Sequence, residues 1–241
     1  MARWPPPLPL RPASAFHNAS YYNYQRETIM QGLYLVTPNW DDTARLLDVT
    51  EQALAEGVAM LQYRHKDASP ELRMKQSAEL LALCRRYGVP FIVNDHVDLC
   101  LLIGADGIHL GATDARIAQT RALLGPDTII GASCYGEMQL ALDAQEAGAS
   151  YVAFGGFYLS RVKQYAVTTQ PGILDEARRR VHLPRVVIGG MTPQNAAPLV
   201  ARGAHMVAAV SGVYMVDDTA QAVRDFNALF LAEPAAELLS E

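Results

Sequence analysis

The 241-residue chain has few cysteines and no long apolar run, and each shortage excludes a class of protein. Its three cysteines (Cys84, Cys100 and Cys134) are odd in number and widely spaced, which excludes a disulfide framework and a cysteine metal motif. No apolar stretch approaches the roughly 20 residues that cross a bilayer. We therefore expect a protein of the reducing cytoplasm, with no membrane segment.

Positive charge is also scarce. Lysine and arginine together number 20 against 25 acidic residues, and the formal net charge is −5. No basic face is available for nucleic acid, so a small anionic partner must be held by a few well-placed cations. The chain is 50% hydrophobic and long enough to bury the core of one large domain, and a homo-oligomer is compatible with this composition.

The two ends of the chain differ in composition from the middle. Residues 1–29 contain clustered prolines without apolar periodicity, which predicts a disordered Pro-rich tail, and Met30 is then a hypothetical functional start. Residues 233–241 are predicted to form a flexible C-terminal end. One folded domain is predicted over residues 30–232.

Short β-rich apolar runs alternate with segments of helical periodicity along that domain. The eight runs cover residues 33–37, 60–64, 91–94, 107–111, 129–133, 151–156, 185–190 and 206–212. Eight βα units in roughly 200 residues predict an α/β fold with a single (β/α)8 TIM barrel. The alternative is a doubly wound open sheet, but the GxGxxG expected after its first strand is absent, so the closed barrel is favoured.

The second predicted strand ends in a cationic sequence, L-Q-Y-R-H-K. Alternation along a strand places Gln62, Arg64 and Lys66 on one face and Tyr63 with His65 on the other. Two buried cations without a fixed anion are unfavourable, so we interpret this face as a phosphate-binding surface. The alternatives are a paired layer inside the barrel or a lysine that simply lies in the loop.

One aspartate follows each of the next two strands, Asp95 after the third and Asp114 after the fourth. Each precedes a helical segment, so each alone is readily explained as a helix N-cap. Neighbouring parallel strands lie about 4.8 Å apart, so the two carboxylates together can serve a hard cation that keeps several waters, such as Mg²⁺. Both interpretations stay open on the sequence alone.

Candidate ligand contacts also follow the fifth and sixth strands. Ser133 offers a hydroxyl at the end of the fifth, whereas Cys134 is expected to be a small buried residue rather than a nucleophile. A long, weakly periodic segment after the sixth strand has the character of a binding loop, with Ser160 and Lys163 as its candidate contacts.

Small residues end the last two strands, at Gly189-Gly190 and Val210-Ser211-Gly212. Their backbone N–H groups can approach a phosphate closely, and these two loops are where barrels commonly hold one. His109, inside the fourth strand, is expected to be a packed core histidine rather than a base.

Several of these motifs occur together in one known family. The stretches YLVT, QYRHK, NDHVDL and ADGIHLGATD, the serine after the fifth strand, S-x-V-K, and IGG followed by TPQN appear in family order. From Gly32 to about Phe230 the chain resembles thiamine phosphate synthase, also called thiamine phosphate pyrophosphorylase. The resemblance implies a Mg²⁺-dependent transferase that joins 4-amino-2-methyl-5-hydroxymethylpyrimidine diphosphate to 4-methyl-5-(2-hydroxyethyl)thiazole phosphate and releases pyrophosphate.

The resemblance also implies roles for individual residues. The pyrimidine diphosphate contacts are Gln62, Arg64, Lys66, Asn94, Ser133 and Lys163. The Mg²⁺ ligands are Asp95 and Asp114, and the thiazole phosphate pocket is formed by Ser160, Gly190, Val210 and Ser211. Arg64, Lys66 and Lys163 are the expected catalytic groups, because they neutralise charge that grows on the departing diphosphate.

The sequence departs from the family pattern at a few positions. Ala112 replaces the usual glutamine of HLGQxD, and Gly156, Ser160 and Val162 stand where the family has a proline and two threonines. Two rival functions are therefore kept. A related thiazole tautomerase type of barrel uses a histidine after the fifth strand, where this chain has Tyr135, and a non-catalytic phosphometabolite-binding barrel would not need both aspartates.

Overall fold

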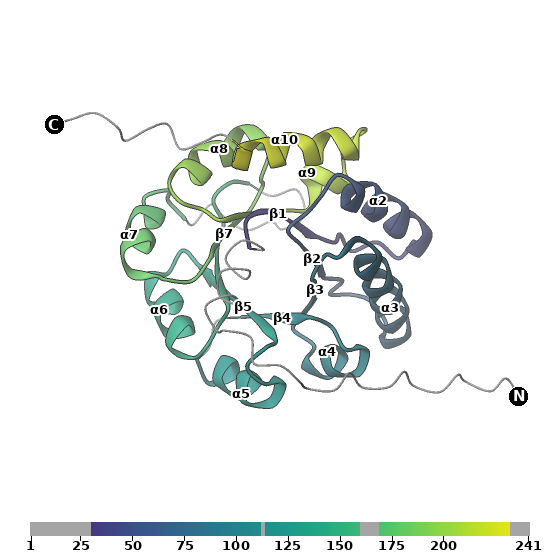
Figure 1. Cartoon of the computed structure of the whole chain (residues 1–241), viewed down its shortest axis with the longest axis horizontal. Helices are drawn as coiled ribbons and strands as arrows, with labels where there is room; N and C mark the ends of the chain where they lie inside the picture. The colour runs from purple at the N-terminus through teal and green to yellow at the C-terminus, as the bar shows by residue number, and fades with distance from the viewer. Residues whose placement is uncertain (1–29, 112–113, 160–168, 232–241) are drawn as a thin grey trace, which may run out of the picture.

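The computed structural model describes residues 30–111, 114–159 and 169–231, without the side chains of Asp114 and Ala115. The expectations for the two ends of the chain and for Ala112, Ser160, Val162 and Lys163 lie outside these residues. Eight parallel strands close into a barrel in the order β1 to β8, with β1 paired to β8, and helices surround them (Figure 1). The predicted TIM barrel is confirmed.

The strands are β1 (Gly32–Val36), β2 (Met60–Tyr63), β3 (Phe91–Asn94), β4 (Gly107–Gly111), β5 (Ile129–Tyr135), β6 (Tyr151–Gly155), β7 (Arg185–Ile188) and β8 (Met206–Ala209). The helices are α2 (Thr43–Ala55), α3 (Pro70–Tyr87), α4 (Val97–Ile103), α5 (Asp114–Leu124), α6 (Met138–Glu146), α7 (Ile173–Arg180), α8 (Pro193–Ala201), α9 (Ser211–Tyr214) and α10 (Thr219–Leu231). Among the described residues, none of these helices is long and apolar enough to span a membrane.

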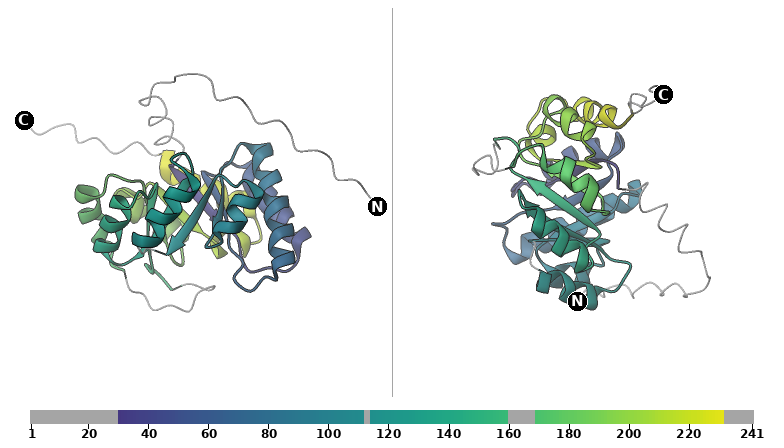
Figure 2. Two further views of the ribbon diagram at one scale, coloured as in Figure 1. Left: turned by 90° about the horizontal axis from the view of Figure 1, so that it is seen from below. Right: turned by 90° about the vertical axis from the view of Figure 1, so that its left-hand side faces the viewer.

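The apolar core has two layers, one on each side of the barrel wall. The larger layer packs between the strands and the surrounding helices. Figure 2 shows these helices around the barrel from two sides. The smaller layer fills the barrel interior and includes Met30, Tyr34, Met60, Tyr151 and Met206. Strand residues are therefore buried on both faces, which explains why the runs read as continuously apolar rather than alternating.

Three strand ends differ from the sequence prediction by two residues or more. β5 continues to Tyr135 through a bulge after Ser133, and Tyr135 has a φ of 51°. β7 stops at Ile188 because Gly189 and Gly190 both have positive φ, which is incompatible with a strand. β8 stops at Ala209, since Ser211 already begins the short helix α9, which the sequence analysis did not predict. All three deviations lie at the carboxyl-terminal ends of the strands.

The opposite end of the barrel holds a histidine with a depressed pKa. Burial, and then the positive charge of Arg185, lower the pKa of His205 to about 4, and its Nδ1 accepts the backbone N–H of Arg185 at 3.2 Å. The folded protein therefore keeps His205 neutral at pH values where the unfolded chain protonates it. Stability is complete above the ordinary histidine pKa of about 6.5 and falls as the pH drops from there towards 4.

We predict that His205→Gln reduces this pH dependence. The loss of unfolding free energy between pH 7 and pH 4.5 should be smaller in the variant by roughly 2 kcal/mol, because solvent screens part of the effect on a half-buried ring. Urea denaturation at the two pH values measures the difference. Equal losses in both proteins would show that His205 does not carry the effect.

Candidate active site

A cavity of about 520 Å³ opens at the carboxyl-terminal ends of the strands. Four residues predicted on the pyrimidine diphosphate side line it: Gln62, Arg64, Asn94 and Ser133. They come from the ends of three strands, β2, β3 and β5, and β4, which lies between the last two, contributes His109. The structure thus brings together a cation, two amides and a hydroxyl in one cavity.

Hydrogen bonds to Thr37 fix the position of Arg64. The Arg64 N–H donates to Thr37 Oγ1 at 2.8 Å, and the same hydroxyl donates to the Arg64 carbonyl at 3.3 Å. Thr37 is buried directly after β1, so it anchors the first residue beyond β2 from the neighbouring strand. Arg64, which lines the cavity, is consequently held at a fixed backbone position.

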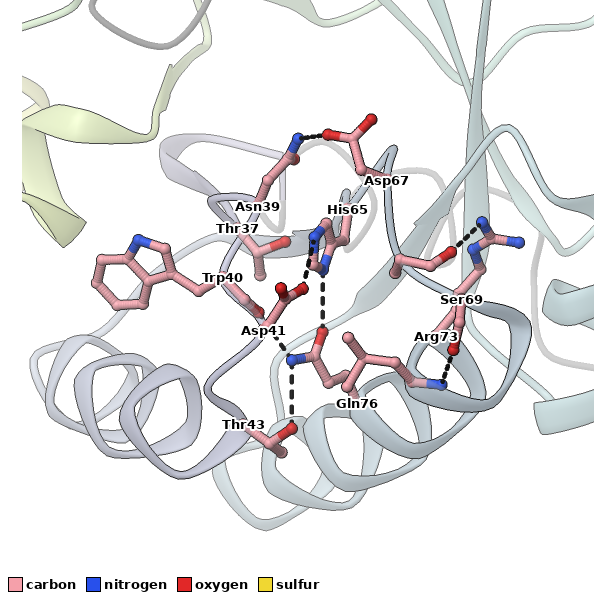
Figure 3. A network of polar contacts seen from close by, with 12 residues as sticks. Thr37, Asn39, Trp40, Asp41, Thr43, His65, Asp67, Ser69, Arg73 and Gln76 are labelled. Carbon is pink, nitrogen blue, oxygen red and sulfur yellow. Dashed lines mark hydrogen bonds and ion pairs between the residues drawn. The ribbon is translucent and has the colours of Figure 1, made fainter.

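The other face of the same segment is tied to helix α3 through Gln76, a fully buried amide (Figure 3). Gln76 Oε1 accepts from the Tyr63 hydroxyl at 3.0 Å and lies 3.5 Å from His65 Nδ1. Its Nε2 donates to Thr43 Oγ1 at 3.3 Å, while His65 Nε2 lies 3.4 Å from Asp41. Tyr63 and His65 therefore face the helices, as the predicted alternation requires, and Gln62 and Arg64 face inwards.

Lys66 lies beyond the end of β2, in a turn where strand alternation no longer applies. It lines a second, smaller cavity of about 210 Å³, together with Asp95, His96 and Arg73. Asn94 lines both cavities, so the two adjoin at the end of β3. Lys66 thus stands beside the predicted metal ligand rather than next to Gln62.

Asp95 has a left-handed backbone, with a φ of 63°, and follows β3 directly. Asn94 Nδ2 donates to its carboxylate at 2.7 Å, and Arg116 donates to its carbonyl at 2.8 Å and lies 3.6 Å from its carboxylate. The N-cap of α4 is His96, which makes no side-chain capping bond. The interpretation of Asp95 as a helix cap is therefore not supported, and its half-exposed carboxylate is available at the mouth of the barrel.

Asp114 is the first residue of α5, and its side chain lies outside the described part of the structure. β3 and β4 are paired in register, with Asn94 opposite His109, so Asp95 and Asp114 follow neighbouring strands as predicted. Within the described residues, no group of three or more His, Cys, Asp or Glu side chains gathers as a metal site. The structure therefore places the Asp95 carboxylate at this strand end, and ligation of a metal by Asp95 and Asp114 stays a prediction.

The far side of the large cavity is formed by the residues that follow β7 and β8. Gly190, Val210 and Ser211 all line it, as the sequence predicts. Gly190 has a φ of 61°, and a Cβ there would lie 2.3 Å from the carbonyl oxygen of Leu159. Only glycine allows the chain after β7 to approach the segment after β6 this closely.

We predict that Gly190→Ala destabilises the fold through this contact. Gly88→Ala is the matched control, because Gly88 has a φ of 66° but a Cβ there would meet nothing within 4 Å. Chemical denaturation should show a loss of about 1 kcal/mol for Gly88→Ala, from the left-handed backbone, and roughly 2 kcal/mol more for Gly190→Ala. Equal losses would mean that the approach to Leu159 is not a constraint.

The segment after β6 is anchored at both of its described ends. Tyr158 N donates to the Gly189 carbonyl at 3.2 Å, and the Tyr158 hydroxyl donates to the Asn195 carbonyl at 2.9 Å. The Thr169 hydroxyl donates to the carbonyl of Gly155. These bonds fix the described ends of the segment at Tyr158 and Thr169.

His109 and Cys134 differ in their relation to the cavity. His109 is buried as expected, but it also lines the cavity, and its Nε2 lies 2.8 Å from Ser133 Oγ. Burial raises the pKa of the Cys134 thiol to about 12, so the thiol stays protonated and is no nucleophile. The sequence analysis was correct that both residues are buried, and it did not anticipate that His109 also lines the cavity.

Two further residues at the site were missed. Tyr34 lines the cavity and contacts Gln62, and Arg116 pairs with Asp95. The YLVT motif contained a signal for Tyr34, because a tyrosine on the inner face of a barrel strand needs a polar partner. Arg116 lies two positions after Asp114 in a helix without clear amphipathicity, and nothing in the sequence marks it as a partner of Asp95.

Comparisons with known proteins identify a family for the chain. Residues 33–213 match the family model described as thiamine monophosphate synthase. The chain is 59% identical to the thiamine-phosphate synthase of Janthinobacterium sp. (strain Marseille) over 201 residues, covering 83% of this chain and 97% of that protein. It is 49% identical to the thiamine-phosphate synthase of Thiobacillus denitrificans, covering 86% and 98%.

Solved structures that resemble this chain include a protein of the same family. The thiamine phosphate pyrophosphorylase of Pyrococcus furiosus superposes with a TM-score of 0.71 at 29% identity, covering 85% of this chain and 96% of that one. A 3-hexulose-6-phosphate synthase superposes with a TM-score of 0.62 at 17% identity, which shows a shared fold alone. With its barrel, its cavity residues and these relatives taken together, the chain belongs to the thiamine monophosphate synthase family.

Proposed function

We propose that this protein condenses hydroxymethylpyrimidine diphosphate with hydroxyethylthiazole phosphate, giving thiamine phosphate and pyrophosphate, with Mg²⁺. The observation that carries the proposal is the convergence of Arg64, Gln62, Asn94 and Ser133 on one cavity, with Asp95 and Lys66 in the adjoining one. A diphosphate that spans the two cavities at Asn94 would meet cations from both. The relatives named as thiamine-phosphate synthases support the same reaction.

The reaction replaces one bond to the exocyclic methylene carbon with another. The carbon–oxygen bond to the diphosphate breaks, its electron pair leaves with the diphosphate, and the methylene becomes cationic. The thiazole nitrogen then supplies its lone pair to form the new carbon–nitrogen bond. Arg64 and Lys66 neutralise the charge that grows on the leaving group, which lowers the barrier electrostatically. No nucleophilic side chain is required.

The residues present fit a Mg²⁺ ion. Asp95 is not used as a helix cap, its carboxylate is half-exposed, and Asp114 begins the helix after the neighbouring strand. Mg²⁺ is commonly held by one or two carboxylates together with phosphate oxygens and water, which matches a set of two aspartates. When bound, the ion supplies positive charge to the diphosphate. Asn94 and Arg116 hold the Asp95 carboxylate in place through their contacts with it.

The thiazole phosphate is assigned to the opposite side of the cavity. There, Gly190 and the start of α9 at Ser211 expose backbone N–H groups, and a phosphate accepts such donors readily. Ser160 is assigned to the same pocket and Lys163 to the diphosphate, both from the segment after β6. The thiazole nitrogen would then approach the methylene from within the barrel.

Purified full-length protein incubated with both substrates, with and without Mg²⁺, tests the proposal. We expect thiamine phosphate and pyrophosphate to appear in equal amounts, and only with the metal. Tight substrate binding without turnover would instead favour the phosphometabolite-binding barrel. Isomerisation of a thiazole carboxylate phosphate without metal would favour the tautomerase type.

A further inference from the structure

A continuous chain of polar side chains crosses the floor of the cavity. Gln62 Nε2 lies 2.7 Å from the Tyr34 hydroxyl, which lies 2.7 Å from the Tyr151 hydroxyl. The Tyr151 hydroxyl lies 2.9 Å from His109 Nδ1, and His109 Nε2 lies 2.8 Å from Ser133 Oγ. Five strands contribute one residue each, and both ends of the chain line the cavity.

The hydrogens in this chain have one consistent direction. Gln62 presents its amide nitrogen, which can only donate, to Tyr34, so the Tyr34 hydrogen goes to Tyr151. Tyr151 then donates to Nδ1 of the imidazole. His109 consequently carries its proton on Nε2 and donates it to Ser133 Oγ.

The surroundings keep the two phenols protonated and in place. Tyr34 and Tyr151 are fully buried, and burial raises the pKa of each hydroxyl well above its usual value of 10. The Tyr151 ring also stacks on His109 with an interplanar angle of 19°. Space for this ring exists because residue 131 is glycine, where a Cβ would lie 2.0 Å from Tyr151 Cζ.

The direction of the chain determines what each end offers to a ligand. The Gln62 amide nitrogen donates one hydrogen bond to Tyr34, so its Oε1 can accept a hydrogen bond from an amino group of a ligand. Ser133 accepts from His109, and its own hydroxyl hydrogen is left to donate to an anion. A reversed chain would present amide hydrogens at Gln62 and only lone pairs at Ser133, which would repel a phosphate oxygen.

We propose that Tyr34, Tyr151 and His109 are positioning residues that couple Gln62 to Ser133, so that the cavity selects a ligand with an amino donor at one end and an anionic acceptor at the other. The substrate side of this inference rests on the proposed function, because an aminopyrimidine diphosphate has that pattern. The direction in which hydrogen bonds are donated along the chain rests on the contacts alone. The coupling is cooperative, since breaking one link leaves both ends free to reorient.

The first test is the tautomer of His109 in the ligand-free protein. A two-bond proton–nitrogen correlation spectrum of protein labelled at its histidines reports which ring nitrogen carries the proton, and His109→Gln assigns the signal. We expect the Nε2–H form in the wild type and a mixture of tautomers in Tyr151→Phe, which loses the donor to Nδ1. A wild-type His109 protonated on Nδ1, or on both nitrogens, would overturn the proposal whether or not the protein is a synthase.

The second test separates positioning from general stability. Tyr214→Phe is the matched control, because Tyr214 is also buried and its hydroxyl lies 2.8 Å from Thr50, outside the chain. We expect Tyr151→Phe to raise KM for the pyrimidine diphosphate about tenfold and to leave KM for the thiazole phosphate unchanged. Tyr214→Phe should change neither. Equal KM values in the two variants would overturn the proposal.

Discussion

Asp95→Asn is expected to lower kcat at least about 100-fold while leaving the free energy of unfolding close to that of the wild type. Asparagine is nearly the same size and tolerates the left-handed backbone that Asp95 adopts, so the fold after β3 should persist. Loss of the carboxylate charge weakens the binding of a divalent cation and removes the ion pair with Arg116. Steady-state kinetics across a range of Mg²⁺ concentrations measures the effect, and higher Mg²⁺ should restore part of the activity. Asp114→Asn should behave alike.

Asp98→Asn is the matched control for this prediction. Asp98 is an exposed acidic residue in the first turn of α4, three positions from Asp95 but turned to solvent. Its replacement should leave kcat unchanged and cost only a few tenths of a kcal/mol of helix stability. Wild-type turnover in both Asp95→Asn and Asp114→Asn would reduce the two aspartates to local structural roles.

Arg64→Gln is expected to lower kcat by roughly 100-fold, because a preorganised donor to the leaving group is lost. The backbone at this position is fixed by Thr37, so the loss should fall on catalysis rather than on folding. Rapid-quench measurement of pyrophosphate release separates the chemical step from product release. The thermal midpoint should stay within a few degrees of the wild type.

Arg179→Gln removes an exposed guanidinium from α7, on the outer ring of helices, and serves as the control. It should leave both pyrophosphate release and stability unchanged. A wild-type rate of pyrophosphate release in Arg64→Gln would contradict the assignment of this arginine to the leaving group. A slow rate in both variants would point to a general effect of net charge.

The barrel could be predicted from the sequence because the eight apolar runs are separated by segments with clear helix-start and helix-stop residues. Ser69 before Pro70 and Thr192 before Pro193 cap α3 and α8 as their sequences suggest. Alternation along β2 also placed Gln62 and Arg64 inside the barrel correctly. These features depend on local patterns, which a single sequence displays directly.

The missed features depend on contacts between distant segments. Arg116 reaches Asp95 across 21 positions, and Tyr151 reaches Tyr34 across 117. The bulge in β5 and the early end of β8 arise where the backbone turns towards the cavity, and no periodicity signals either. Lys66 was grouped with Gln62 by strand alternation, which fails once the strand has ended.

A crystal structure of the protein with Mg²⁺ and inorganic pyrophosphate tests the central claim most directly. We expect the ion between the carboxylates of Asp95 and Asp114, and the pyrophosphate in contact with Arg64, Lys66 and Ser133. Pyrophosphate bound elsewhere on the molecule, or a metal ion that touches neither aspartate, would contradict the account.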